Sequence, residues 1–245
     1  MKQGFLKITE NKLLVPTVCR MVLTGDTSAI TCPGQFINLK LDGLYLRRPI
    51  SVCDADDKTV TILYKIVGTG TEQMAAMPVG TEIDVLSGLG NGFDVADAGE
   101  KTLLIGGGIG SAPLYWLARE LIAMGKKVTC VLGFNSKDDV IYADEFRALG
   151  TEVLISTVDG SEGVKGFVTD AMAGLDYDYF YTCGPEPMLK AVYKASTCDG
   201  QFSFEERMGC GFGACMGCSC KVVTGYKRIC KDGPVLRKEE LLWGD

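Results

Sequence analysis

The sequence predicts three successive folding units: an antiparallel β-barrel over residues 1–98, a parallel-sheet α/β domain over 99–200, and a small cysteine-rich domain over 201–245. Two changes along the chain predict this order. Short apolar runs between glycine and proline turns, typical of a barrel, give way near residue 100 to alternating strand and helix patterns, which build a parallel sheet. Near residue 201 the alternation ends, and a loop dense in cysteine and glycine follows.

Five short runs in the first unit have the length and apolar content of strands. Turns such as Thr24–Asp26 and Cys32–Gly34 separate neighbouring runs. A short helix is expected before the last run, at Thr71–Met77. The predicted strands are Phe5–Ile8, Val18–Leu23, Gln35–Leu41, Val60–Ile66 and Glu82–Leu86.

The second unit alternates buried strands with helices of 3.6-residue periodicity. Its first strand ends in Gly106-Gly-Gly-Ile-Gly110, and the first helix follows directly. Because parallel strands place ligand sites at their carboxyl ends, this turn is a candidate nucleotide site. The predicted strands are Thr102–Ile105, Lys127–Leu132, Val153–Thr157 and Tyr179–Thr182, and the predicted helices are Ala112–Met124, Val140–Leu149 and Phe167–Ala173.

The glycine turn departs from the dinucleotide pattern G-x-G-x-x-G, because Ser111 stands at the third glycine position. The acidic residue expected about twenty positions later is also missing, since the second strand ends at Leu132-Gly-Phe-Asn135. The sequence therefore leaves NAD and NADP open. A second glycine-bearing turn, Cys183-Gly-Pro-Glu-Pro-Met188, follows a later strand. Two such turns at one sheet edge would frame one crevice.

The third unit has three cysteines spaced C-x4-C-x2-C and a fourth after a hairpin-like excursion: Cys210, Cys215, Cys218 and Cys230. This spacing is typical of a plant-type [2Fe–2S] cluster, which passes one electron at a time. Glycines at 209, 211, 213 and 217 would let backbone N–H groups approach the sulfur atoms closely. Cys220 is interpreted as a bystander, with a role as an alternative ligand left open.

Other metal sites fit this pattern less well. The chain has no histidine, which excludes Rieske ligation and every mixed cysteine–histidine zinc site. A zinc site of four cysteines stays open, as do free or disulfide-bonded cysteines. Zinc ribbons, however, use two separated C-x2-C pairs, and only Cys215 and Cys218 form such a pair here.

Composition excludes several classes of protein. The 245 residues are 47% hydrophobic and 23% charged, with a formal net charge of −6 and no lysine–arginine block. This is the composition of a globular protein without an electrostatic footprint for nucleic acid or an anionic membrane. No window reaches the length of a membrane span, and the first residues lack the apolar core of a signal peptide. Eleven cysteines in such a chain predict reduced thiols plus a metal site, and hence the cytoplasm.

One further motif, Arg48-Pro49-Ile50-Ser51, lies in the predicted barrel. Together with the two glycine turns, it resembles the motifs of ferredoxin reductase-like flavoproteins, in which an FAD-binding antiparallel barrel precedes a nucleotide-binding α/β domain. More narrowly, Leu46–Ser51 with Glu205–Cys218 is similar to the electron-transfer subunits of NAD-linked (type B) dihydroorotate dehydrogenases. The resemblance covers the whole chain in the expected order.

The resemblance implies that the barrel binds FAD. Arg48 would pair with the pyrophosphate through its fork of donors. Ile50 would cover one face of the isoalloxazine in place of the family's stacking tyrosine, and Ser51 would hydrogen-bond near N5, which exchanges hydride. Lys65-Ile66-Val67 would supply strand backbone, and Gly70-Thr71 would hold phosphate. The alternatives are that Arg47-Arg48 is a solvated pair and that Ser51 is an ordinary strand hydroxyl.

The resemblance also implies an NAD site between the two glycine turns. Cys183 would lie where the nicotinamide approaches the flavin, with a buried structural thiol as the alternative. Glu205, Glu206 and Arg207 are interpreted as solvated charges, with steering of a partner or shaping of the cluster loop as the alternative. The implied NAD contacts are Gly106, Gly107, Gly108, Gly110, Cys183, Gly184 and Pro185.

The function implied by the resemblance is electron transfer in pyrimidine biosynthesis. Electrons would run from the flavin of a catalytic dihydroorotate dehydrogenase subunit through the cluster and this chain's FAD to NAD, in a heterotetramer of two of each chain. Because the cofactors carry the chemistry, no protein general base is required, in keeping with the lack of histidine. One alternative is a reductase subunit of a bifurcating ferredoxin–NADP reductase, sulfide dehydrogenase or hydrogenase. Another is a zinc-bearing, nucleotide-binding interaction module.

Overall fold

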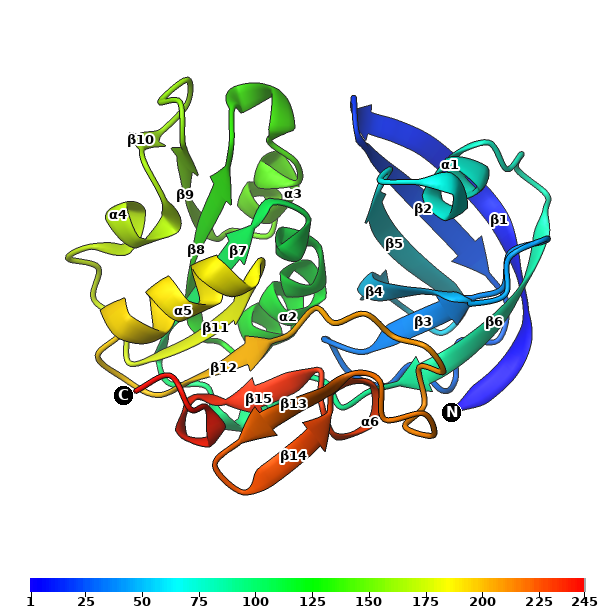
Figure 1. Cartoon of the computed structure of the whole chain (residues 1–245). Helices are drawn as coiled ribbons and strands as arrows, with labels where there is room; N and C mark the ends of the chain where they lie inside the picture. The colour runs from blue at the N-terminus through cyan, green and yellow to red at the C-terminus, as the bar shows by residue number, and fades with distance from the viewer. Residues whose placement is uncertain (245) are drawn as a thin grey trace.

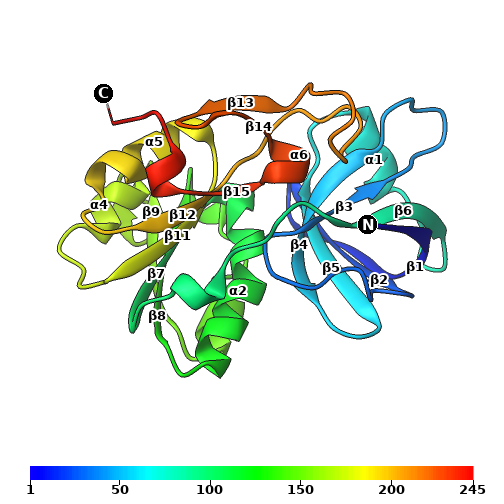
Figure 2. The ribbon, with the colours of Figure 1, turned by 90° about the horizontal axis from the view of Figure 1, so that it is seen from below.

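A computed structural model describes residues 1–244 of the chain. A barrel and an α/β domain lie side by side, and the C-terminal segment runs across both at one end of the molecule (Figures 1 and 2). The predicted fold class is confirmed. Among residues 1–244, no helix combines the length and apolar character that crossing a membrane requires.

The barrel is closed and antiparallel, with strand order β1-β2-β5-β4-β3-β6. All five predicted strands are present, and β4 is an additional one that the sequence analysis treated only as a motif. Its polar side chains face the domain junction, so it lacks a clear alternation of apolar and polar residues. The elements are β1 (Lys2–Val15), β2 (Val18–Thr24), β3 (Phe36–Leu39), β4 (Arg48–Ala55), β5 (Thr59–Lys65), α1 (Thr69–Ala75) and β6 (Glu82–Leu89).

The α/β domain contains a seven-stranded sheet of order β10-β9-β8-β7-β11-β12-β15, in which only β15 runs antiparallel to its neighbour. The strands are β7 (Lys101–Gly107), β8 (Lys127–Phe134), β9 (Glu152–Thr157), β10 (Val164–Lys165), β11 (Tyr179–Cys183), β12 (Gly200–Ser203) and β15 (Val235–Arg237). The helices are α2 (Ala112–Ala123), α3 (Ala143–Ala148), α4 (Val168–Met172) and α5 (Glu186–Ala195), with short 3-10 turns η1 (Val95–Asp97), η2 (Gly108–Ser111), η3 (Lys137–Asp139) and η4 (Lys238–Glu240).

Four elements of this domain differ from the prediction, and one of them is the two-residue strand β10, which was not predicted. Helix α3 begins at Ala143 rather than Val140, because Tyr142 has a left-handed φ of 61°, which a helix does not accommodate. Helix α5 and strand β12 were not predicted. In α5 only Leu189 and Val192 are buried, so its apolar stripe is narrow.

The C-terminal segment is folded along most of its length. The expected hairpin between the third and fourth cysteines is present and consists of β13 (Ser219–Val222) and β14 (Gly225–Arg228). Helix α6 (Ile229–Asp232) follows, and β15 then pairs with β12 at the edge of the large sheet. Residues 201–203 and β15, both assigned to the third unit from sequence, thus complete the sheet of the second.

Helix α2 joins the two large domains. Its Trp116 is buried among the side chains of the barrel core. Arg119 forms an ion pair with Asp54 of β4, with Nη1 and Oδ1 2.7 Å apart, and its Nη2 donates to the Ala55 carbonyl at 2.9 Å. The amino-terminal end of the same helix, which follows the first glycine turn, is therefore held at a fixed position beside the Arg48–Ser51 strand.

Candidate functional site

A cavity of about 260 Å³, here the barrel cavity, lies where the barrel, α2 and the C-terminal crossing meet. Pro49, Ile50 and Ser51 of β4 and Lys65 of β5 form its barrel wall. The opposite wall consists of Ile109, Ala112, Pro113, Phe204, Glu205, Glu206, Met208 and Pro234, and Phe36 and Tyr64 complete the lining together with Leu63. Three residues of the Arg48–Ser51 motif therefore border a partly open cavity at the domain junction.

A second cavity of about 580 Å³, here the sheet cavity, lies at the carboxyl ends of β7, β8, β9 and β11. Gly107 and Gly108 of the first glycine turn line it, as does Pro185 of the second turn. This is the sheet edge where open α/β domains bind ligands. The two cavities share Lys65, Ile109 and Glu205, so they adjoin.

The two glycine turns pack against each other, as expected for turns that frame one crevice. A Cβ on Gly107 would lie 2.3 Å from Met188 Sδ, and a Cβ on Gly110 would lie 2.5 Å from the Cys183 carbonyl oxygen. Glycine is thus required at both positions by close approach. Gly106 packs on Ser111 in the same way, and Gly184 on Met188.

Arg48 and Gly70 form a cradle beside the barrel cavity. A Cβ on Gly70 would lie 2.3 Å from Arg48 Nε, so the guanidinium rests directly on the Gly70 backbone. The Thr71 hydroxyl accepts from the Val67 and Gly68 N–H groups at 2.9 and 3.3 Å and so closes this turn. A guanidinium above a tight turn suits a phosphate, which takes donors from both. The cradle fits the pyrophosphate part of FAD.

The structure separates Cys183 from the other predicted site residues. Its side chain is 2% exposed, is buried in a core cluster, and is not among the lining of either cavity. Burial, followed by the nearby Glu205 carboxylate, raises the pKa of the Cys183 thiol, so the group stays neutral. The position matches the structural alternative for this cysteine.

Glu205, interpreted from sequence as a solvated charge, is exposed to solvent and lies where the two cavities meet. The cavity walls displace part of the water around its side chain. The resulting loss of hydration raises the pKa of the carboxyl above its ordinary 4.5. No cation of residues 1–244 forms an ion pair with it. Sequence gave no sign of this, because the residue's charged neighbours Glu206 and Arg207 suggest a solvent-facing segment.

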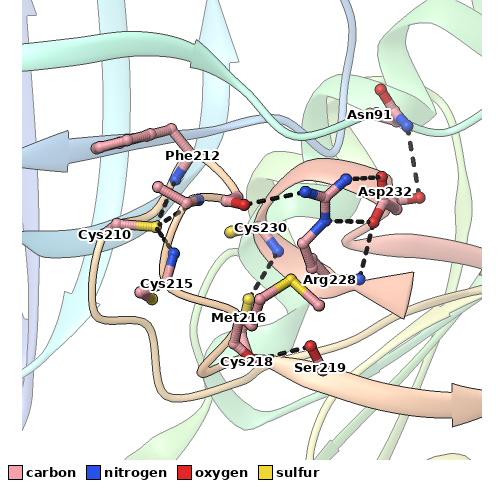
Figure 3. A network of polar contacts seen from close by, with 12 residues as sticks. Asn91, Cys210, Phe212, Cys215, Met216, Cys218, Ser219, Arg228, Cys230 and Asp232 are labelled. Atoms are coloured by element: carbon pink, nitrogen blue, oxygen red, sulfur yellow. Dashed lines mark hydrogen bonds and ion pairs between the residues drawn. The ribbon is translucent and has the colours of Figure 1, made fainter. Parts of the chain in front are cut away.

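The four cluster cysteines meet in two pairs (Figure 3). The Cys215 N–H donates to Cys210 Sγ at 3.4 Å, and the Cys230 N–H donates to Cys218 Sγ at 3.4 Å. Within the described part of the chain, no three cysteine or carboxylate side chains converge on one ion position. In a [2Fe–2S] cluster each iron takes two thiolates and two bridging sulfides, so two thiol pairs on one loop and one helix fit a binuclear group.

Cys210 lies in a nest of backbone donors. The N–H groups of Phe212, Ala214 and Cys215 point at its Sγ from 3.5, 3.2 and 3.4 Å. Burial alone would raise the pKa of the Cys210 thiol, but these donors lower it to about 6. A thiolate is the metal-binding form of cysteine, and these donors favour that form at Cys210.

The pairs differ in exposure. Cys218 and Cys230 are each 2% exposed and pack in a core with Phe36 of the barrel, whereas Cys215 is open to solvent. Cys220 packs on the edge of that same core, and burial raises the pKa of its thiol. The cluster loop therefore lies between the barrel and the molecular surface.

Comparisons with known proteins assign the domains and the family. A family model described as the iron-sulfur cluster binding domain of dihydroorotate dehydrogenase B matches residues 205–242, and one described as an oxidoreductase NAD-binding domain matches residues 104–194. Two curated relatives, from Shouchella clausii and Fusobacterium nucleatum, are named "Dihydroorotate dehydrogenase B (NAD(+)), electron transfer subunit". Each is 46% identical to the chain. The match to the Shouchella clausii protein covers 98% of both proteins. The match to the Fusobacterium nucleatum protein covers 93% of this chain and 94% of the relative.

The chain belongs to this family of electron transfer subunits. The recognition made from Leu46–Ser51 and Glu205–Cys218 is confirmed, and so are the predicted iron–sulfur and NAD-binding domains.

Solved structures agree with this assignment. A chain from a study of the NADH-dependent reduced ferredoxin-NADP oxidoreductase, a flavin-based electron-bifurcating enzyme, has a TM-score of 0.88 at 31% identity and is matched over 98% of this chain and 90% of its own length. A ferredoxin NADP+ reductase from Neisseria gonorrhoeae, solved with bound FAD and NADP, has a TM-score of 0.69 at 19% identity over 80% of this chain and 90% of its own, and shows the shared fold.

Proposed function

We propose that this chain is the electron transfer subunit of an NAD-linked dihydroorotate dehydrogenase. FAD binds in the barrel cavity, NAD in the sheet cavity, and a [2Fe–2S] cluster on Cys210, Cys215, Cys218 and Cys230. When bound, FAD exchanges a hydride with NAD and the cluster passes single electrons. The observation that carries the proposal is the shared wall of the two cavities, because hydride exchange requires two rings in direct contact.

The chain's own residues bind and orient the cofactors. Arg48 and the Gly70–Thr71 backbone hold the FAD pyrophosphate, and Lys65–Val67, at the end of β5 and just after it, contributes backbone groups. Pro49, Ile50 and Ser51 line the ring site, where Ser51 offers a hydroxyl and Ile50 an aliphatic surface. Gly107, Gly108 and Pro185 face the NAD pyrophosphate, while Gly106, Gly110 and Gly184 let the two turns pack closely. Cys183 acts through its backbone, since its thiol is buried.

The partner is the catalytic, flavin-containing subunit, in a complex with two copies of each chain. Phe212, Cys215 and Met216 form what we call the cluster face, with Phe212 43% and Met216 54% exposed. Apolar side chains beside the cluster ligands suit a docking surface across which electrons pass. Eleven free cysteines, including the ligands, are consistent with a reducing compartment, the cytoplasm.

The second candidate is a reductase subunit of an electron-bifurcating complex. It is favoured by the TM-score of 0.88 to the chain from the bifurcating oxidoreductase. Sequence identity separates the two candidates, since that chain is 31% identical and the curated dihydroorotate dehydrogenase relatives are 46% identical.

The test is anaerobic purification of the native complex, followed by reduction with NADH and paramagnetic resonance. We expect a binuclear iron–sulfur signal and a co-purifying chain that oxidises dihydroorotate. Cys215→Ser should abolish the signal while leaving FAD bound, and Cys220→Ser should leave the signal intact. A large multi-cluster partner would instead establish the second candidate. Zinc in place of iron would refute both.

A further inference from the structure

One side chain outside the ligand set joins the cluster loop, residues 210–215, to helix α6. Arg228 ends β14, and its Nη1 donates to the Gly213 carbonyl oxygen at 3.0 Å (Figure 3). Its Nε and Nη2 donate to the Asp232 carboxylate at 2.9 and 3.1 Å. Asp232 also accepts from the Arg228 backbone N–H at 2.9 Å. The guanidinium is thus fixed by an acid one turn along, and its remaining edge faces the loop.

The Gly213 carbonyl and the Ala214 N–H belong to the same peptide group. In a trans peptide these two bonds point in opposite directions. On one side the carbonyl accepts from Arg228, and on the other the N–H donates to Cys210 Sγ at 3.2 Å, the shortest of the three N–H contacts to that sulfur. A charge-assisted bond to the carbonyl polarises the peptide and strengthens its N–H as a donor.

Few contacts from outside orient this loop. The aliphatic stem of Lys231 packs on Gly213, where an added Cβ would lie 2.6 Å from Lys231 Cδ, but it offers no hydrogen bond to the Gly213 carbonyl. Among residues 1–244, the other side chain that donates a hydrogen bond to it is Asn38, whose Nδ2 lies 3.4 Å from the Cys210 carbonyl oxygen. Gly211 and Gly213 have φ values of 78° and 91°, which glycine adopts freely in the unfolded chain and in many loop conformations. The glycines permit the loop's shape but do not enforce it, so an external contact has to.

We infer that Arg228 is a positioning residue for the [2Fe–2S] cluster. It orients the Gly213–Ala214 peptide toward the Cys210 sulfur, and thereby sets how firmly the loop holds the cluster and at what potential the cluster is reduced. Hydrogen bonds to ligand sulfurs and nearby positive charge favour the reduced, more negative state. Loss of Arg228 therefore lowers the reduction potential and loosens the cluster. The inference rests on the proposed cluster ligands.

Three variants of the full chain, in its FAD-loaded complex with the catalytic subunit, separate the hydrogen bonds from the charge. Arg228→Gln removes both, and Arg228→Lys keeps the charge but cannot bridge Gly213 and Asp232 with one planar fork. Lys231→Gln, on the neighbouring helix α6, is the matched control. It removes an equal charge that donates no hydrogen bond to the loop, and glutamine keeps the Cβ, Cγ and Cδ atoms that pack on Gly213.

The readouts are iron release to a chelator, the midpoint potential from a resonance-monitored redox titration, and the iron–sulfur(cysteine) stretching frequencies. We expect iron release to be about 10-fold faster in both Arg228 variants, the range seen when outer partners of metal ligands are removed. The potential should fall most in Arg228→Gln, and the stretching frequencies should shift in both. Lys231→Gln should match the wild type. The FAD content of each purified variant shows whether the chain is folded. If Arg228→Gln loses FAD, the result for Arg228→Lys alone tests the inference.

Wild-type iron release and potential in both Arg228 variants would overturn the inference. An equal change in Lys231→Gln would also overturn it, because charge alone would then explain the result. The absence of any binuclear signal in the wild-type complex is a separate outcome, which refutes the proposed function before Arg228 is tested.

Discussion

Arg47 and Arg48 are neighbours in the sequence, yet their side chains have different partners. Arg47 Nη2 donates to both carboxylate oxygens of Asp84 at 3.0 Å, and its Nη1 donates to the Asp84 carbonyl, so it ties the chain just before β4 to β6. Arg48 lies over Gly70 and forms no ion pair with any acid of residues 1–244. Arg47 thus has a structural role, whereas the Arg48 guanidinium is available to bind an anion.

The Gly70 position offers a direct test of the pyrophosphate cradle. Gly70→Ala should release FAD, because the new Cβ would lie 2.3 Å from Arg48 Nε and displace the guanidinium. Gly68→Ala is the matched control, since nothing lies within 4 Å of a Cβ there and its φ of 163° is ordinary extended backbone. Flavin content of the purified chain is the measurement. Equal FAD content in the two variants would contradict the assignment.

Glu205 should make the stability of the protein depend on pH. Its folded-state pKa lies above the ordinary 4.5, so the unfolded chain gives up this proton at lower pH than the folded protein does. Stability therefore falls as pH rises above about 4.5 toward the raised pKa, because ionisation is less favourable at the cavity junction than in water.

Glu205→Gln removes this penalty. We expect its melting temperature to exceed that of the wild type at neutral pH, and the difference to shrink toward zero at about pH 4, below the pKa of the unfolded chain. Glu206→Gln removes the same charge from the next residue and corrects for net charge. If the melting temperatures of Glu205→Gln and wild type differed by the same amount from acidic to neutral pH, the pKa of the Glu205 carboxyl would not be raised by folding.

At the level of elements, sequence patterns predict what local chemistry determines and miss what tertiary contacts determine. The C-x4-C-x2-C loop and the Gly106–Gly110 turn are recognisable because fixed spacing and glycine freedom are local requirements. Strand β4 was missed because its partly polar face is covered by α2 and not by water. The start of α3 was misplaced because Tyr142 adopts its left-handed backbone in a buried packing site.

Prediction of the site residues from sequence is likewise limited to features that are local in the chain. The residues of the cradle and of both glycine turns could be named from motifs, because each motif lies within a few positions of sequence. Glu205, Asn38 and Arg228 could not, since their partners are distant in sequence or lie in a cavity. For Arg228 one local sign existed, the i,i+4 pairing with Asp232, but it indicates a helix-end ion pair and not contact with Gly213.

At the scale of the whole molecule, the order of three units was predictable because each has its own periodicity, but their mutual arrangement was not. The segment between β12 and β13, which carries the cluster face, runs toward the barrel, whereas β10 lies at the far edge of the large sheet (Figure 1). Phe212→Asp should weaken binding of the catalytic subunit, because a charge would be desolvated at the docking surface.

The control for Phe212→Asp is Val164→Asp, on β10, where 37% of the side chain is exposed. Titration of each variant with the catalytic subunit, followed by size-exclusion chromatography, gives the measurement. We expect at least about a tenfold loss of affinity for Phe212→Asp, the size of effect found for central interface residues. If both variants bind equally, or only Val164→Asp is impaired, the docking surface lies elsewhere.

Strands β12 and β15 are paired side by side, and everything between them, including all four ligands, is a closed excursion from the sheet edge. Stripping the metal therefore opens a loop whose two ends remain anchored, and does not free a dangling end. The thiols stay confined to a small volume at high effective concentration. Reassembly is then a local event within one chain, so a subunit damaged by oxidants can be rebuilt in place when iron and sulfide return.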